Sequence, residues 1–142
     1  MGTPPDGFEP HFRKSAVTDP WEPLFSRRNA ASVDIGLVLC EAHCNSRGLV
    51  HGGVIAALAD NAMGLSFGAA RQPTPGGDPA AKAGAVTVSL AIDYLASAKV
   101  GQWMQITPRV LKAGRSMGFV DALVTADGVV IARANATFRL VD

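Results

Sequence analysis

The sequence predicts an α+β fold in which an antiparallel β-sheet wraps around one long central α-helix. The first sign is a proline-free stretch rich in alanine and leucine at residues 52–70, which is typical of a helix. The second is a set of four strand-like stretches after that helix, and the third is the short turns between the later strands, which favour antiparallel pairing. With 142 residues, 48% hydrophobic and 18% charged, the chain suits one folded domain.

The N-terminal region, residues 1–27, is predicted to be a proline-rich arm, and residues 28–142 are predicted to form the folded domain. Prolines are too frequent in the arm for regular structure, although residues 21–25 could form a short turn that docks on the domain. No apolar stretch there resembles a secretory signal. Cys40 and Cys44 would lie too far apart on a strand to form a disulfide, so we expect reduced thiols and a cytoplasmic protein.

The first elements of the domain are read in chain order. Apolar residues recur at short intervals over 30–42, which indicates the first strand, and 43–48 is expected to be a loop. The central helix is expected at 52–70. Prolines and glycines are frequent over 72–84, which indicates a second loop.

The later strands are read from alternation and from turn residues. Apolar and polar residues alternate along the chain after the second loop. Asp127-Gly128 is a hairpin-turn signal. Pro108 cannot donate a hydrogen bond to a neighbouring strand, so we expect it at an edge or a bulge. The predicted strands are 86–94, 104–110, 115–126 and 129–140.

The central helix is apolar or glycine on every side apart from Asp60, Asn61 and Ser66, so we expect the sheet to bury it. A membrane span would need about 20 apolar residues without a central carboxylate, so we expect no membrane association. One sheet would still leave edges and apolar area exposed, which predicts a homodimer and its assembly into a homotetramer. The formal net charge of +1 gives no global field that favours nucleic acid.

A candidate oxyanion hole lies where the helix begins. The run from Gly48 to Gly53 brings the backbone into the helix N-terminus, where free N–H groups and the positive end of the helix dipole can polarise a carbonyl. Gly52 and Gly53 lack the Cβ that would keep a substrate at a distance. Double glycines are also common at ordinary helix starts, so this pattern alone leaves both interpretations open.

Asp60 is the second candidate, because a carboxylate inside an apolar helix is costly. It can be a structural partner in a core or subunit contact, or a nucleophile or general base. Asp60 follows Gly52 by eight positions, which is about 12 Å along the helix axis. One chain cannot easily place both on one carbonyl, whereas antiparallel helices of a two-fold dimer could. We therefore predict composite sites at a dimer interface.

Two segments carry a resemblance to a known family. Asn45-Ser-Arg-Gly-Leu-Val-His-Gly-Gly53, followed by Leu58-Ala-Asp-Asn-Ala-Met-Gly64, resembles the signature of hot-dog-fold thioesterases of the PaaI-like, phenylacetate-pathway group. The resemblance covers about residues 30–140. It implies a hot-dog fold and hydrolysis of an acyl-CoA, with an aryl or medium-chain acyl group, to the free acid and CoA.

The resemblance also implies roles for single residues. Asp60 would be the nucleophile or general base, and the backbone N–H of Gly52, with help from Gly53, would polarise the thioester carbonyl. Asn45 would orient water or the carbonyl. A thioester is already activated, so no metal and no cofactor beyond the CoA of the substrate is expected. Two further residues have weaker assignments: Thr87 as a hydroxyl near the acid and His51 as a turn-stabilising residue beside the site.

The segment Leu111-Lys-Ala-Gly-Arg-Ser116 is similar to the strand turn that contacts coenzyme A in this family. The resemblance implies that Lys112, Gly114, Arg115 and Ser116 bind the CoA part of the substrate. Without it, exposed cations at a strand end are usually solvated. Aromatic residues on the strands could line the acyl pocket or pack in the core or an interface: Tyr94, Trp103 and Phe119.

Other functions stay open at this point. Related hot-dog hydratases and dehydratases use a His with an acid on the central helix, but here His51 adjoins the glycine turn. A non-catalytic acyl-CoA-binding protein would keep the fold, the cations and the pocket. A metal site is disfavoured because the spacing matches no recognised zinc pattern; its ligands would be Cys40, His43, Cys44 and His51.

Overall fold

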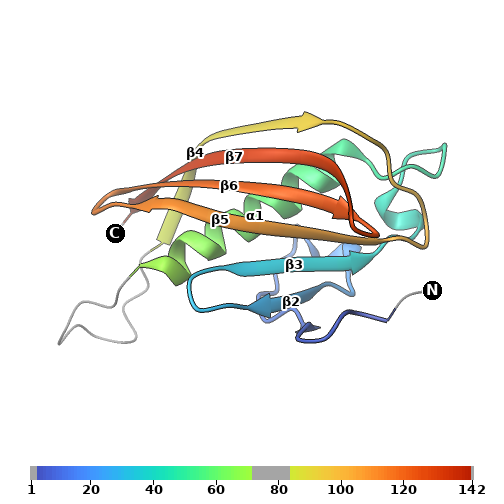
Figure 1. Ribbon diagram of the computed structural model, residues 1–142, viewed down its shortest axis with the longest axis horizontal. Coiled ribbons are helices and arrows are strands. Elements are labelled where there is room, and N and C mark those ends of the chain that lie inside the picture. The colour runs from blue at the N-terminus through green and yellow to red at the C-terminus, as the bar shows by residue number, and fades with distance from the viewer. Residues whose placement is uncertain (1–2, 72–83, 142) are drawn as a thin grey trace.

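The computed structural model describes residues 3–71 and 84–141 of the chain. In these residues, strands form one antiparallel sheet in the order β1-β2-β3-β5-β6-β7-β4, and the helix α1 lies along one face of it (Figure 1). The predicted antiparallel sheet around a long central helix is confirmed. The strands are β1 (Glu9–Pro10), β2 (Phe25–Arg28), β3 (Val33–Val38), β4 (Gly84–Tyr94), β5 (Trp103–Ala113), β6 (Met117–Ala126) and β7 (Val129–Val141).

The helix α1 (Gly52–Ala70) has the predicted bounds, but a single chain buries only one side of it. The expectation that the sheet covers every side is therefore wrong for one chain. By length and composition α1 could also cross a membrane, yet its buried side packs on the chain's own sheet. The buried side carries Val54, Ile55, Leu58, Ala59, Ala62, Met63, Ser66 and Phe67. The other side carries small and polar residues that are only half-buried: Ala56, Ala57, Asp60, Asn61 and Gly64.

The N-terminal region is more ordered than a proline-rich arm would be. β2 pairs with β3 from Phe25 to Arg28, and β1 pairs with β2 at the edge of the sheet. A 3₁₀ turn, η1 (Asp19–Trp21), lies between them, with a proline in its first turn, where no N–H is needed. Leu24 is fully buried in the core. Contacts between segments distant in the sequence therefore give regular structure to residues whose local composition does not predict it.

The remaining predicted elements differ mainly at their ends. The strand predicted at 30–42 is the shorter β3, because a 3₁₀ turn, η2 (Glu41–His43), follows it, so that the predicted loop begins inside this turn. The predicted loop at 72–84 lies outside the described residues except for Gly84, which begins β4. The turn between β6 and β7 is at the predicted Asp127-Gly128, both with positive φ (47° and 83°).

Pro108 lies in β5 where the sheet can accept a proline. The pairing of β5 with β3 ends at Ile106, so Pro108 has an unpaired side, while its other side faces Ala122 of β6. A bulge follows between Val110 and Lys112. The prediction of an edge or bulge at Pro108 is confirmed.

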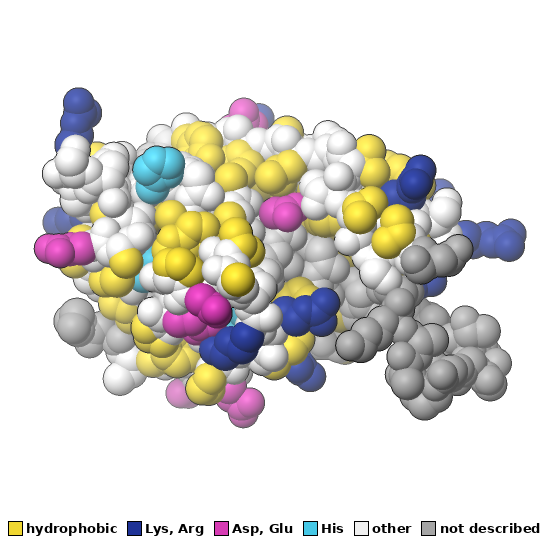
Figure 2. Space-filling view, turned by 180° about the vertical axis from the view of Figure 1, so that it is seen from behind, with side chains coloured by type: hydrophobic (Ala, Val, Ile, Leu, Met, Phe, Trp, Pro, Cys, Tyr) yellow, Lys and Arg dark blue, Asp and Glu magenta, His cyan; other side chains and the backbone are white. Residues whose placement is uncertain are grey.

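β4 forms one edge of the sheet, paired on one side with β7. Its apolar side chains are exposed in the single chain, including Val86 (45%), Val88 (57%) and Leu90 (38%). Figure 2 shows the side of the molecule that carries α1 and β4, where many apolar side chains are exposed. An apolar edge strand with free backbone groups is suited to pairing with another chain.

Candidate active site

Asp60 and Thr87 meet on the open side of the helix. The Thr87 hydroxyl donates a 2.7 Å hydrogen bond to Oδ1 of Asp60, which joins the middle of α1 to the start of β4. Asp60 is half-buried, and its Oδ2 accepts from no donor among the described residues. The hydroxyl of Thr87 therefore lies near the acid, and the catalytic role of Asp60 stays a prediction.

A β-bulge places Thr87 on the helix side of β4. The register with β7 shifts between Thr87 and Ser89, so that Val88 is the extra residue. Before the bulge the helix-facing residue is Thr87, and after it the helix-facing set includes Leu90 and Tyr94. Strict alternation along the strand would place Thr87 and Leu90 on opposite faces. The bulge puts both on the helix side, and alternation in the sequence does not predict it.

His51 caps the N-terminus of α1. Its Nδ1 accepts the backbone N–H of Gly53 at 2.9 Å, and its backbone carbonyl accepts the N–H groups of Val54 and Ile55. The N–H of Gly53 is therefore occupied and cannot also polarise a substrate carbonyl, which corrects the auxiliary role expected for Gly53. The N–H of Gly52 has no acceptor within the described residues, so it is the free donor at this helix end.

Tyr94 packs over the start of the helix, a contact that the sequence did not specify. Its hydroxyl donates a 2.7 Å hydrogen bond to the carbonyl oxygen of Gly52. A Cβ at Gly52 would lie 3.2 Å from the Tyr94 hydroxyl and ring. Glycine at position 52 thus leaves room for the close approach of Tyr94, and Tyr94 fixes the peptide that follows the Gly52 N–H.

Asn45 shapes the loop before the helix. Its Oδ1 accepts the backbone N–H groups of Arg47 (2.9 Å) and Leu49 (3.2 Å), and Gly48 adopts a positive φ of 74° in the same turn. The side-chain oxygen of Asn45 therefore holds the turn together. A role for Asn45 toward substrate, through its amide nitrogen, stays a prediction.

One chain does not bring Gly52 and Asp60 together. Both lie on the same continuous helix, eight residues and about 12 Å apart along its axis. In one chain the two groups are therefore separate: an N–H without an acceptor among the described residues lies at the helix start, and a carboxylate with its hydroxyl partner lies near the helix middle.

A pocket of about 550 Å³ opens beside Asp60. Its floor includes apolar and glycine residues from the second half of α1 and from β7, and its wall includes residues of the N-terminal segment and of β2. The sequence had left the N-terminal segment outside the site. The lining of the pocket includes Phe12, Arg13, Arg28, Asn61, Arg71 and Thr87.

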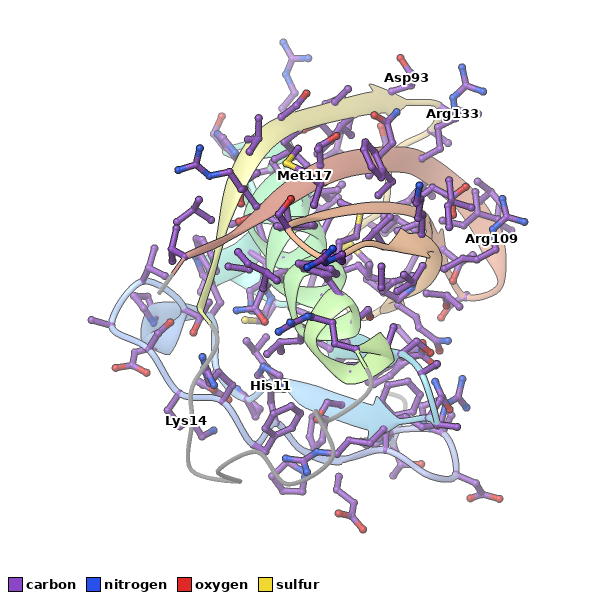
Figure 3. The ribbon with its side chains drawn as sticks, turned by 90° about the vertical axis from the view of Figure 1, so that its left-hand side faces the viewer. His11, Lys14, Asp93, Arg109, Met117 and Arg133 are labelled. Atoms are coloured by element: carbon purple, nitrogen blue, oxygen red, sulfur yellow. The ribbon has the colours of Figure 1, made fainter. Side chains whose placement is uncertain are left out.

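The four residues predicted to bind CoA lie together in the hairpin between β5 and β6. The Gly114 N–H donates to the carbonyl of Met117 at 2.7 Å, and a Cβ at Gly114 would lie 2.9 Å from that oxygen, which explains the glycine. Lys112 and Arg115 are exposed, and the Ser116 carbonyl accepts from β7. The hairpin lies at the same end of the molecule as the C-terminus of α1 (Figure 1), and Figure 3 labels Met117 there.

The two histidines of the metal hypothesis, His43 and His51, have structural partners. The Nδ1 of His43 accepts the N–H of Cys40 at 2.9 Å, and its Nε2 lies 2.8 Å from the carbonyl oxygen of Trp21. His43 thus joins η1 to the loop before the helix. Within residues 3–71 and 84–141, no three His, Cys, Asp or Glu side chains are grouped to hold a metal ion.

Trp103 lies outside the pocket. It packs edge-on against Phe8, with 5.1 Å between ring centroids, and covers Gly36, where a Cβ would lie 2.2 Å from the indole. Phe119 is exposed, and it faces away from the helix because it alternates with the buried Gly118 and Val120. Of the three strand aromatics that were weighed for the acyl pocket, only Tyr94 lies at the candidate site.

Comparisons with known proteins identify the family of the chain. The sequence profile of the thioesterase superfamily matches residues 47–133. Human acyl-coenzyme A thioesterase 13 is 32% identical over 127 residues, 84% of each chain. A Streptococcus mutans protein solved with bound acetyl-CoA is 25% identical with a TM-score of 0.74, over 92% of this chain and 94% of that one. PaaI of Escherichia coli shares the fold, with a TM-score of 0.71 at 16% identity over 84% and 80%. The chain has the predicted hot-dog fold, belongs to the thioesterase superfamily and is a thioester hydrolase.

Proposed function

We propose that the protein hydrolyses acyl-CoA thioesters to the free acid and CoA. The observation that carries this proposal is the Asp60–Thr87 contact on the open side of α1, beside a pocket of about 550 Å³. A relative of similar length is named an acyl-coenzyme A thioesterase, and a structural neighbour binds acetyl-CoA. The pocket volume suits an aryl or medium-chain acyl group.

The active unit is a two-fold dimer in which each site is shared between chains. The edge strand β4 is apolar and unpaired on its outer side, and the neighbouring open face of α1 carries small residues that permit close packing. If two α1 helices lie antiparallel across this face, the Gly52 N–H of one chain approaches Asp60 of the other. Further apolar side chains on the outer face of the sheet, such as Phe119 (41%) and Leu123 (50%), favour assembly into a tetramer.

The reaction uses three groups. The Gly52 N–H polarises the thioester carbonyl at the positive end of the helix, and it stabilises the negative charge that develops on oxygen. Asp60, oriented by Thr87, either attacks the carbonyl carbon or takes a proton from an attacking water. In both routes a C–O bond forms, the C–S bond breaks, and the sulfur of CoA leaves and is protonated. Where Asp60 itself attacks, the product is an acyl–Asp60 anhydride, and water then hydrolyses it to the free acid and restores the carboxylate. The exposed cations Lys112 and Arg115, with Gly114 and Ser116 of the hairpin, bind CoA phosphates.

The direct test measures thiol release from a panel of acyl-CoA substrates. Asp60→Asn keeps the shape of the side chain and removes its basicity, so kcat should fall about 10³-fold. The matched control is Asp93→Asn, because Asp93 is an exposed carboxylate at the sheet edge, paired with Arg133 (Figure 3). Unchanged turnover in Asp60→Asn would refute the proposed role of this residue.

The same panel separates the other enzyme classes. Hydration of an enoyl-CoA without thiol release would indicate a hydratase. Tight binding of acyl-CoA with neither reaction would indicate a binding protein. The proposed function requires thiol release by the wild-type protein and its loss in Asp60→Asn.

A further inference from the structure

The pocket beside Asp60 is lined by more positive charge than a neutral acyl group would need. Three arginines line it, and Asp60 is the only acidic residue among its described lining residues. None of the three forms an ion pair with another described residue. The arginines of the pocket are Arg13, Arg28 and Arg71.

Strand geometry separates Arg28 from its neighbour Arg27. Successive residues of a strand face opposite sides, and Arg27 turns away from the helix to pair with the buried Asp34 at 2.9 Å. Arg28 is opposite Val33 on the helix side of the sheet, where Val33 also contacts Ser66 of α1. Two adjacent arginines thus have different roles, since the first is neutralised in the sheet and the second lines the pocket.

The guanidinium of Arg28 lies over an aromatic ring. Its Cζ lies 3.5 Å from the centroid of the Phe12 ring, a cation–π contact between two exposed side chains. The contact restrains the guanidinium, whose N–H groups can bind an anion in a forked arrangement. A restrained cation loses less conformational entropy on binding than a flexible one.

The N-terminal segment that supplies Phe12 and Arg13 is anchored to the body of the protein. His11, the residue before them, is 2% exposed, and its backbone N–H donates to the carbonyl of Leu24. The His11 side chain lies beside Asn61, the helical neighbour of Asp60, and Figure 3 shows His11 close to α1. The anchor therefore places the segment against the site itself.

The backbones of two of the arginines lie toward the C-terminal end of α1 from Asp60. Arg28 pairs with Val33, and Val33 contacts Ser66, which is six residues beyond Asp60 and about 9 Å along the helix axis. Arg71 follows the last helical residue, eleven residues beyond Asp60 and about 16 Å along the same axis. An anion bound between these two arginines would lie on the C-terminal side of the thioester that Asp60 attacks.

We infer that Arg13, Arg28 and Arg71 form an anion subsite at the far end of the pocket, which binds a carboxylate or phosphate of the substrate remote from its thioester. The inference rests on the proposed function, because it assigns the pocket to an acyl-CoA. The anion has two sources in such a substrate. It is either a carboxylate at the distal end of the acyl group or a phosphate of CoA.

The experiment uses two substrates of equal chain length, hexanoyl-CoA and adipoyl-CoA, of which only the second ends in a carboxylate. Free CoA is added as an inhibitor to probe the phosphates alone. The variants are Arg28→Gln and Arg13→Gln, each with a thermal melt to confirm folding. The matched control is Arg109→Gln, which removes an equal charge from an exposed site on the outer face. Figure 3 labels Arg109 there, and it pairs with Asp121 at 2.8 Å.

Each source predicts a different pattern. If the ligand is an acyl carboxylate, Arg28→Gln lowers kcat/KM for adipoyl-CoA about tenfold and leaves hexanoyl-CoA unchanged. If it is a CoA phosphate, KM rises about tenfold for both substrates, and inhibition by free CoA weakens equally. Either pattern supports the subsite, provided that the control variant Arg109→Gln does not show it.

The subsite is overturned if Arg28→Gln and Arg13→Gln both match the wild type with all three ligands. A wild-type protein that hydrolyses neither substrate would instead refute the proposed function. In that case the binding of the same three ligands, measured by calorimetry, still tests the subsite. The arginine variants should lose about tenfold in affinity. Unchanged affinity in these variants would refute the subsite.

Discussion

At the scale of single residues, the site depends on small polar contacts between distant parts of the chain. Thr87 reaches Asp60 across 27 positions of sequence, and Tyr94 reaches Gly52 across 42. His51 occupies the Gly53 N–H and leaves the Gly52 N–H free. Capping therefore separates the two amides at the helix start: the Gly53 N–H binds the cap, and the Gly52 N–H is the one that a ligand could bind.

Thr87→Val tests the contact with the carboxylate. Valine keeps the shape of the side chain but cannot donate a hydrogen bond, so Asp60 loses its orienting partner. We expect kcat for thiol release to fall about 10- to 100-fold with little change in KM. Thr137→Val, on the neighbouring strand β7, should leave both constants unchanged. Equal kcat in Thr87→Val and wild type would show that the hydroxyl has no part in catalysis.

His11 gives the fold a predicted dependence on pH. Burial lowers the pKa of His11 below its ordinary value of 6.5, and Asn61 beside it offsets part of this shift. Below pH 6.5 the unfolded chain therefore binds a proton that the folded chain resists. The free energy of unfolding should fall as the pH drops from 6.5 toward the folded pKa.

Urea unfolding at pH 7.5 and pH 5.5 measures this effect. The wild-type protein should lose stability at the lower pH, and His11→Gln, which cannot titrate, should lose less. An equal loss in both proteins would show that other groups account for the acid sensitivity.

At the scale of elements, glycines set how closely the helix approaches the sheet. A Cβ at Gly118 of β6 would lie 2.4 Å from the Phe67 ring of α1, whereas a Cβ at Gly68 would meet nothing within 4 Å. The two positions are thus a matched pair for packing. One lies beneath the helix in the sheet, and the other lies on the helix's exposed side.

Gly118→Ala should destabilise the fold by about 1–3 kcal/mol, because Phe67 or the strand must shift. Gly68→Ala should be neutral or stabilising by up to about 1 kcal/mol, because alanine favours the helix. Chemical denaturation of both variants measures the difference. A Gly118→Ala protein as stable as the wild type would contradict the close packing.

The elements also show what a single sequence can predict. The helix bounds followed from composition, because a proline-free Ala- and Leu-rich stretch is a strong local signal. Asp60 and Gly52 were found because a carboxylate or a double glycine is conspicuous on an apolar helix. The bulge at Val88 is not predictable from the sequence, because it depends on the register of β4 with β7. Only the resemblance, and not the alternation of residues, therefore indicated that Thr87 lies near Asp60. The N-terminal wall of the pocket was missed because its order comes from pairing with β3 and from the burial of His11.

At the scale of the whole molecule, the proposed site needs two chains. The free N–H and the carboxylate lie about 12 Å apart along one continuous helix, a separation that two antiparallel helices would remove. The open face of α1 and the apolar edge of β4 adjoin these groups. Assembly of two copies is therefore part of the proposed chemistry, beyond its contribution to stability.

Gly52→Pro removes the free N–H at the first helical position, where no intrahelical hydrogen bond is lost, and it adds bulk beside Tyr94. Proline is favoured at the first helical position, and the extended His51 before it has a compatible backbone (φ −72°, ψ 132°). We expect kcat to fall at least 10²-fold, as for loss of an oxyanion donor. Gly52→Ala keeps the N–H and separates this loss from the effect of bulk near Tyr94.

Mixed dimers of Asp60→Ala and Gly52→Pro chains test the shared site most directly. If each site takes Asp60 from one chain and Gly52 from the other, every mixed dimer holds one intact site and one doubly altered site. Unfolding and refolding the two inactive proteins together at equal concentration should restore about a quarter of wild-type thiol release, because about half of the dimers are mixed. Activity that stays at the level of the separate variants, in a sample where mixed dimers are shown to form, would contradict the account.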